Sequence, residues 1–208
     1  MSLLEIYLKD LSWPDKKKYL FATGREWWNL AQIQITNIDE GFTIYTDAYK
    51  YAADTLVEYA KRDKTSINFL IFPILFLYRH YIELALKQLI YTASKYLDNT
   101  QYSFNSHDLI SLWETTKELI LKLVNVIDDF NIPKNELIAV ENQIKQFDSL
   151  DRSSMTFRYP IDKNGNVFKN LSDYINIENV RQIMDGLFSW FYGLVCFIDE
   201  YQELKKQL

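Results

Sequence analysis

The stretch FPILFLYRHYIELALKQLI (residues 72–90) decides the fold, because it is apolar almost throughout and yet carries an arginine beside a histidine. The apolar pattern of residues 65–96 predicts a long, largely buried helix. Pro73, near its start, marks either a first turn or a kink. Burial of Arg79 and His80 costs free energy unless both side chains find partners, so this helix requires a polar neighbour.

A helical wheel groups the polar residues of this segment. At about 100° per residue, Glu83 and Lys87 follow Arg79 along one stripe, and His80 lies at the edge of the same sector. Apolar residues fill nearly all of the remaining circumference and also flank the group along its own stripe. We call Arg79, His80, Glu83 and Lys87 the polar cluster. It is a confined group and not a continuous solvated face.

Two explanations of the polar cluster stay open at this point. In the first, Arg79, Glu83 and Lys87 form ion pairs at i,i+4 spacing on a partly exposed strip, and His80 is a hydrogen-bonded residue at the edge of the core. In the second, the cluster lines a pocket in which the arginine and the histidine face an anion or a polar helix.

The composition favours a soluble, cytoplasmic helical protein. The 208 residues include only 5 glycines and 4 prolines, which argues against an all-β chain with many turns. The net charge of −5 provides no overall basic field for nucleic acid or membrane, although a local basic pocket is compatible with it. Cys196 is the only cysteine, which excludes an intrachain disulfide. The longest apolar run, residues 67–78, is shorter than the ~20 residues of a membrane helix, so we expect no membrane partner.

The chain predicts an all-α fold, an antiparallel bundle of four or five helices with a short extended turn segment. A tight turn is expected at Asn164 and Gly165. Residues 1–42 are expected to form an aromatic-rich extension docked on the core, and residues 43–208 the bundle, within a single structural domain overall. Apolar spacing predicts helices over about 43–61, 65–96, 106–127, 136–150 and 176–208.

The second histidine suggests a partner for the polar cluster. His107 and Asp108 open the helix that follows the central one, with Asn105 or Ser106 as the expected N-cap and Asp108 in the first turn. If the two helices are antiparallel, His107 lies near the C-terminal end of the central helix, about four to five turns from His80. Asp148, Asp151 and Arg158 are further candidates, brought close through the non-helical segment.

Three motifs resemble the HEPN domain family. FLYRHYIELALKQLI (residues 76–90) is similar to the helix of that family that ends in an aliphatic-Glu-aliphatic-Ala/Leu-Lys pattern. HDLISLW (residues 107–113) is similar to the His-Asp-Leu that opens the family's next helix. LDRSSMTFRYPID (residues 150–162) resembles the segment with Arg-Tyr-Pro that follows the bundle's third helix. The resemblance covers about residues 43–200 and leaves out the N-terminal extension.

The resemblance implies a helical bundle, often dimeric, with roles in RNA cleavage, nucleotide or RNA binding, toxin–antitoxin pairs and phage defence. Ribonucleases of the family carry an arginine, a polar residue and, after four to six residues, a histidine. No arginine of this chain has a histidine in that window. The chain therefore departs from the family's pattern at the residues that cleave RNA.

The first hypothesis is a non-catalytic HEPN-like module that binds a nucleotide, an RNA or a cognate protein partner, as a homodimer. Positive side chains would hold a phosphate, and Glu83 would orient Arg79. Tyr78, Tyr81 or Tyr159 would stack on a base, unless each serves only to pack the core. The candidate ligand-binding residues are Arg79, His80, Glu83, Lys87, His107, Asp108, Asp151, Arg158 and Tyr159.

Three alternatives belong to other classes. An unorthodox metal-independent endoribonuclease would use His80 or His107 as general base and Arg79 or Arg158 to stabilise the phosphorane. A structural scaffold would dimerise through the apolar C-terminal helix. A metal-dependent bundle would build on His80 and Glu83, but such a site needs a second Glu/His helix. We expect no metal and no other cofactor.

Overall fold

The structure is a computed structural model that describes residues 16–21, 24–98, 105–128, 130–168 and 174–207. The chain divides into two units, residues 1–35 and residues 36–208. The described part of the first unit contains one short 3-10 helix, η1 (Trp27–Asn29), in which the rings of Trp27 and Trp28 meet edge to face at 6.0 Å. The docking of residues 1–42 on the bundle stays a prediction.

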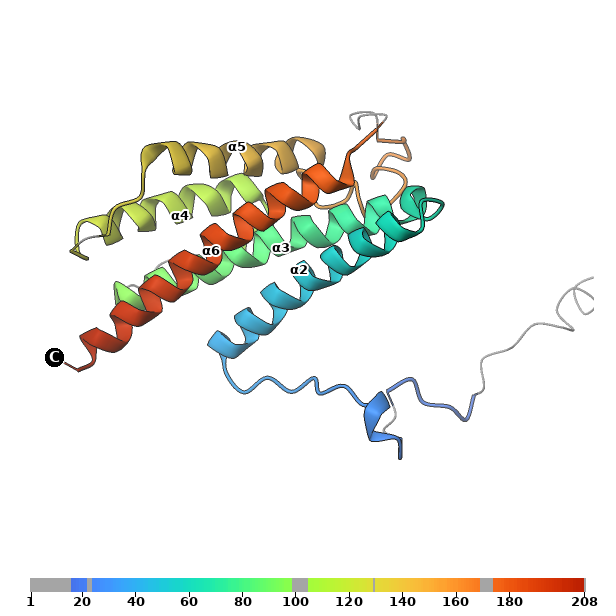
Figure 1. Ribbon diagram of the computed structural model, residues 1–208, viewed down its shortest axis with the longest axis horizontal. Helices are drawn as coiled ribbons and strands as arrows, with labels where there is room; N and C mark the ends of the chain where they lie inside the picture. The colour runs from blue at the N-terminus through green and yellow to red at the C-terminus, as the bar shows by residue number, and fades with distance from the viewer. Residues whose placement is uncertain (1–15, 22–23, 99–104, 129, 169–173, 208) are drawn as a thin grey trace, which may run out of the picture. The chain divides into compact units, whose positions relative to one another are not determined.

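The second unit is all-helical, as the sequence predicts. It contains α2 (Ile38–Arg62), α3 (Ile67–Tyr96), α4 (Leu109–Val124), α5 (Lys134–Leu150) and α6 (Ile177–Lys205). Helix α3 packs against α2, α4 and α6, and α5 packs on the outer side of α4 (Figure 1). Within the described ranges, the extended structure is limited to one antiparallel bridge between Ile161 and Val167.

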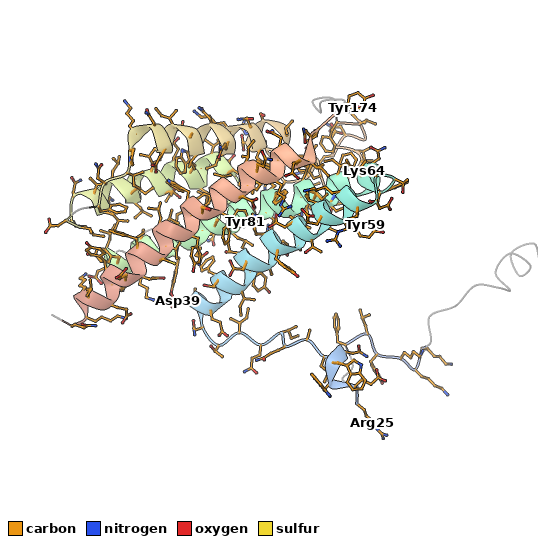
Figure 2. The ribbon with its side chains drawn as sticks, in the orientation of Figure 1. Arg25, Asp39, Tyr59, Lys64, Tyr81 and Tyr174 are labelled. Carbon is orange, nitrogen blue, oxygen red and sulfur yellow. The ribbon has the colours of Figure 1, made fainter. Side chains whose placement is uncertain are left out.

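Helix α3 forms the centre of the bundle. Its buried side chains include Tyr78, Ile82, Leu86 and Leu89, and these belong to the main hydrophobic core. Side chains fill the space between the helices, and Tyr81 points into it (Figure 2). By length and composition alone α3 is also apolar enough to cross a membrane, a property that it shares with the core helices of soluble proteins.

Two helix starts differ from the prediction. Helix α2 begins at Ile38, five residues before the expected Thr43, because the side chain of Asn37 caps it by accepting a hydrogen bond of 2.9 Å from the Glu40 amide. Helix α4 begins at Leu109, and its N-cap is Asp108, not Asn105 or Ser106. Asp108 accepts a bond of 2.7 Å from the amide of Ser111, and its backbone is still extended.

The segment after α5 forms the predicted tight turn. Gly165 adopts a positive φ of 81°, a conformation that a residue without a Cβ takes at little cost. The Asp162 carboxylate accepts hydrogen bonds of 2.8 Å from the amides of Asn164 and Asn166. This turn brings Val167 back beside Ile161, next to the loop that carries Arg158 and Tyr159.

Candidate functional site

The side chain of Arg79 lies at the centre of a buried hydrogen-bond network and is 0% exposed. Its Nε donates to the carbonyl of Asp151 over 2.9 Å, and its Nη2 donates to the carbonyl of His107 over 2.9 Å. Its Nη1 donates to Glu83 Oε2 over 3.2 Å. One guanidinium on α3 therefore holds the end of α5 and the segment before α4.

Asp151 extends this network into the following loop. Its Oδ1 accepts hydrogen bonds of 2.6 Å from the Met155 amide and 2.9 Å from the Thr156 amide. Its Oδ2 lies 3.6 Å from Arg79 Nε and has no hydrogen bond of its own. Because the side chain of Asp151 is fully buried, Arg79 supplies the positive charge that compensates it. The arginine and the aspartate together fix the start of the loop that leads to Arg158.

Glu83 contacts Lys87 and His107 in addition to Arg79. Its Oε1 accepts from Lys87 Nζ over 2.9 Å and lies 2.7 Å from His107 Nδ1. Burial acts to raise the pKa of Glu83, but the hydrogen bonds from Lys87 and His107 outweigh it and hold that pKa below its ordinary value. Arg79, Glu83 and Lys87 thus form the i,i+4 ion pairs of the first explanation, but Arg79 and Glu83 are buried and do not lie on a partly exposed strip.

His107 lies closer to the polar cluster than predicted. Its ring reaches Glu83, less than one turn beyond His80, and its carbonyl contacts Arg79. The antiparallel arrangement of these two helices, which would place His107 near the C-terminal end of α3, does not occur. Helix α4 begins beside the middle of α3, where Arg79 holds the His107 carbonyl, and runs in the same direction as α3 (Figure 1). The His107 side chain is 75% exposed, so it forms the solvent edge of the network.

His80 does not join the Arg79 network. Its ring meets Tyr49 of α2 edge to face at 4.4 Å and stacks on Phe76, one turn earlier in α3, at 5.9 Å and 7°. Burial is the main cause that lowers the pKa of His80. Within the described chain no three His, Cys, Asp or Glu side chains gather in a metal-binding group. His80 and Glu83, the suggested half of an iron site, have different neighbours.

Arg158 is the exposed arginine of the site. Its Nε donates to the Ser154 carbonyl, and its Nη2 lies 3.8 Å from the Met155 sulfur. Its guanidinium carbon lies 5.8 Å from the ring centre of Phe76 and 5.9 Å from that of Tyr159. No carboxylate in the described residues comes within ion-pair distance of it. A cation in this state is available to an anion from solution.

Arg158 borders a cleft of about 430 Å³. This volume is within the range of small-molecule sites. Phe72 and Tyr159, which are 45% and 50% exposed, offer ring surface to it. We call this space the Arg158 cleft; its lining residues are Phe72, Thr156, Phe157, Arg158, Tyr159, Pro160, Val167 and Phe168.

The predicted site residues therefore separate into two groups. Arg79, Glu83, Lys87, His107 and Asp151 share the buried network. Asp108 lies beside this network as the cap of α4, and its carboxylate is 3.8 Å from the exposed Arg152.

His80 and Arg158 instead contact the ring of Phe76, and Tyr159 contacts Arg158. The sequence analysis does not identify Phe76, or Phe72 of the cleft, as site residues. The i,i+4 spacing of Phe72, Phe76 and His80 is the sequence signal for their shared face, and both phenylalanines belong to the apolar residues that flank the polar cluster.

Comparison of the chain with family models, with curated proteins and with solved structures gave no match. The resemblance to the HEPN family therefore rests on the three motifs alone.

The buried network predicts a large stability cost for the loss of Arg79. Arg79→Met keeps the approximate length of the side chain but removes the donor to Glu83 Oε2 and to the carbonyls of Asp151 and His107. It also leaves the buried carboxylate of Asp151 without its compensating charge. We expect the free energy of unfolding to fall by about 3–5 kcal/mol in urea denaturation. Arg152→Met removes an arginine that is 82% exposed and should change it by less than about 0.5 kcal/mol. Equal effects of the two variants would show that the network does not hold the fold.

His80 predicts a pH dependence of stability. Its pKa is lower in the folded protein than its ordinary value of 6.5, so the unfolded chain binds more protons just below that pH. The free energy of unfolding should therefore decrease as the pH falls below 6.5. His80→Phe, which keeps a ring in the stack, should flatten this slope in denaturation between pH 6.5 and about 5.5, where an unfolded glutamate with an ordinary pKa of 4.5 is still largely ionised and Glu83 contributes little. An unchanged slope would contradict the assignment to His80.

Proposed function

We propose that this chain is a non-catalytic, HEPN-like helical protein that binds a nucleotide, free or as part of an RNA, in the Arg158 cleft. One observation carries the proposal. An exposed guanidinium, without a carboxylate partner in the described chain, lies against aromatic rings at the edge of a cleft of ligand size. The HEPN resemblance would give such a protein a part in a toxin–antitoxin or phage-defence system.

The chemistry of the cleft matches the two halves of a nucleotide. A guanidinium binds phosphate through charge-assisted hydrogen bonds, and the Nη edge of Arg158 faces no carboxylate of the described residues. The half-exposed rings of Phe72 and Tyr159 offer a surface on which a base can stack.

The loop that carries Arg158 is ordered before any ligand arrives. Arg79 holds the Asp151 carbonyl, and the Asp151 carboxylate holds the amides of Met155 and Thr156. The Ser154 carbonyl then accepts from Arg158 Nε. A preformed loop loses less conformational entropy on binding, which favours affinity. In this proposal Arg79 supports the site and Arg158 contacts the ligand.

A second candidate function is metal-independent RNA cleavage, and one observation favours a particular pair for it. His80 and Arg158 both contact the ring of Phe76, whereas His107 is bound to Glu83. A neutral His80 is the form that a general base requires. Incubation of a labelled RNA with the protein separates the two candidates. Cleavage that His80→Ala abolishes and His107→Ala leaves intact would favour the nuclease, and no cleavage would favour the binding protein.

The proposal predicts that charge reversal at Arg158 weakens nucleotide binding. Arg158→Glu replaces the cation by a carboxylate that repels phosphate, so the dissociation constant for nucleoside monophosphates should rise at least about tenfold in calorimetry. Arg62→Glu makes the same change in net charge at an exposed arginine on α2 and should leave binding as in the wild type. Both variants should keep their helical circular dichroism.

Two results would contradict this function. Undiminished binding by folded Arg158→Glu would make Arg158 a structural residue. Absence of binding by the wild-type protein to any nucleoside monophosphate or RNA would remove the proposed function altogether.

A further inference from the structure

A continuous series of ring contacts leads away from the Arg158 cleft. It crosses from the loop after α5, over α3, to α2. Arg158 contacts the rings of Tyr159 and Phe76, Phe76 lies 5.9 Å from His80, His80 lies 4.4 Å from Tyr49, and Tyr49 lies 6.4 Å from Tyr45. We call these six residues, Tyr159, Arg158, Phe76, His80, Tyr49 and Tyr45, the aromatic series.

The aromatic series lies at the protein surface. Tyr159 at one end is 50% exposed, and Tyr45 at the other end is 48% exposed. The three rings between them are partly buried. The aromatic residues of the core behave differently, since Tyr78 and Trp113 are 0% exposed. Burial in the core therefore does not account for the two terminal tyrosines.

The middle of the series carries one cation that is not paired with a carboxylate of the described residues, although the chain as a whole is negative. This cation is Arg158, whose guanidinium lies against the rings of Phe76 and Tyr159. Arg79 and Lys87 are also near His80, but Glu83 and Asp151 compensate their charges. A nucleic acid strand that passes this face would therefore be held by a phosphate at Arg158.

We propose that the aromatic series is a binding track for a short single-stranded nucleic acid, with a phosphate at Arg158 and bases stacked at Tyr159 and Tyr45. The inference rests on the proposed function and extends it from one nucleotide to several. A single nucleotide in the Arg158 cleft does not reach Tyr45, because Phe76, His80 and Tyr49 lie between. A ligand that uses both ends must contain several nucleotides. Its bases must also be unpaired, because stacking on a side chain needs a free base face.

The test measures affinity against ligand length by fluorescence anisotropy. Full-length protein is titrated into labelled oligo(rU) and oligo(dT), from single nucleotides to about 12 nucleotides. We expect the affinity to rise with length until both ends are engaged. Tyr45→Ala should weaken binding of the longer oligomers about tenfold and leave mononucleotide binding unchanged. Tyr45→Phe, which keeps the ring, should bind as the wild type does.

Tyr51→Ala is the matched control. Tyr51 is on the same helix and is 74% exposed, but it lines a different hollow together with Asp54, Glu58 and Arg62. Its loss should leave the affinity for every oligomer unchanged. Thermal melting of each variant shows whether the fold is kept, and the Tyr45→Phe variant separates the loss of a ring from a loss of folding.

The outcomes distinguish this inference from the proposed function. If affinity does not grow with length, or if Tyr45→Ala binds long oligomers as tightly as the wild type, the track is refuted while the mononucleotide site at Arg158 can stand. If duplexes bind as tightly as single strands, the track is refuted too. If the protein binds neither mononucleotides nor oligomers, both ideas fail together. Length-dependent binding of either oligo(rU) or oligo(dT) supports the track.

Discussion

The buried guanidinium of Arg79 is the interaction on which the rest of the site depends. It sits in the middle of the central helix, where an uncompensated charge would cost several kcal/mol. Its compensation comes from three separate places along the chain: Glu83 one turn on, the carbonyl before α4 and the carbonyl at the end of α5. The hydrogen bonds of this one cation therefore hold α3, the segment before α4 and the end of α5 together.

This arrangement separates a supporting arginine from a contacting one. Arg79 is buried and donates a hydrogen bond from each of its three nitrogens to the protein, so its charge stabilises the fold and is not available to a ligand. Arg158 is exposed, is oriented by a carbonyl and two rings, and keeps its charge for a ligand. Asp151 joins the two, because its carbonyl accepts from Arg79 and its carboxylate holds the loop toward Arg158. Arg79 therefore holds the loop in place, and Arg158 supplies the charge that a ligand can bind.

The helices were largely predictable, because apolar periodicity and capping residues are local signals. Asn176 caps α6 as expected, and α3 spans nearly the predicted residues. The start of α4 was not predictable in the same way. Ser106 is as good a local cap as Asp108, but the bond from Arg79 to the His107 carbonyl keeps the chain extended up to Asp108. A contact between residues 28 positions apart overrode the local preference.

The sequence by itself determined the all-α class and the central apolar helix, because apolar periodicity is a local signal. It offered the ion pairs of Arg79, Glu83 and Lys87 as one of two explanations, since i,i+4 spacing permits these pairs but does not require them. Only the tertiary structure decided which polar residues face solvent. Arg79 and His80 are adjacent in sequence, yet a rotation of about 100° sends one into the Arg79 network and the other into a stack with Phe76 and Tyr49. The residues that contact Arg79 and His80 come partly from other helices and loops, so the pattern of α3 alone does not predict them.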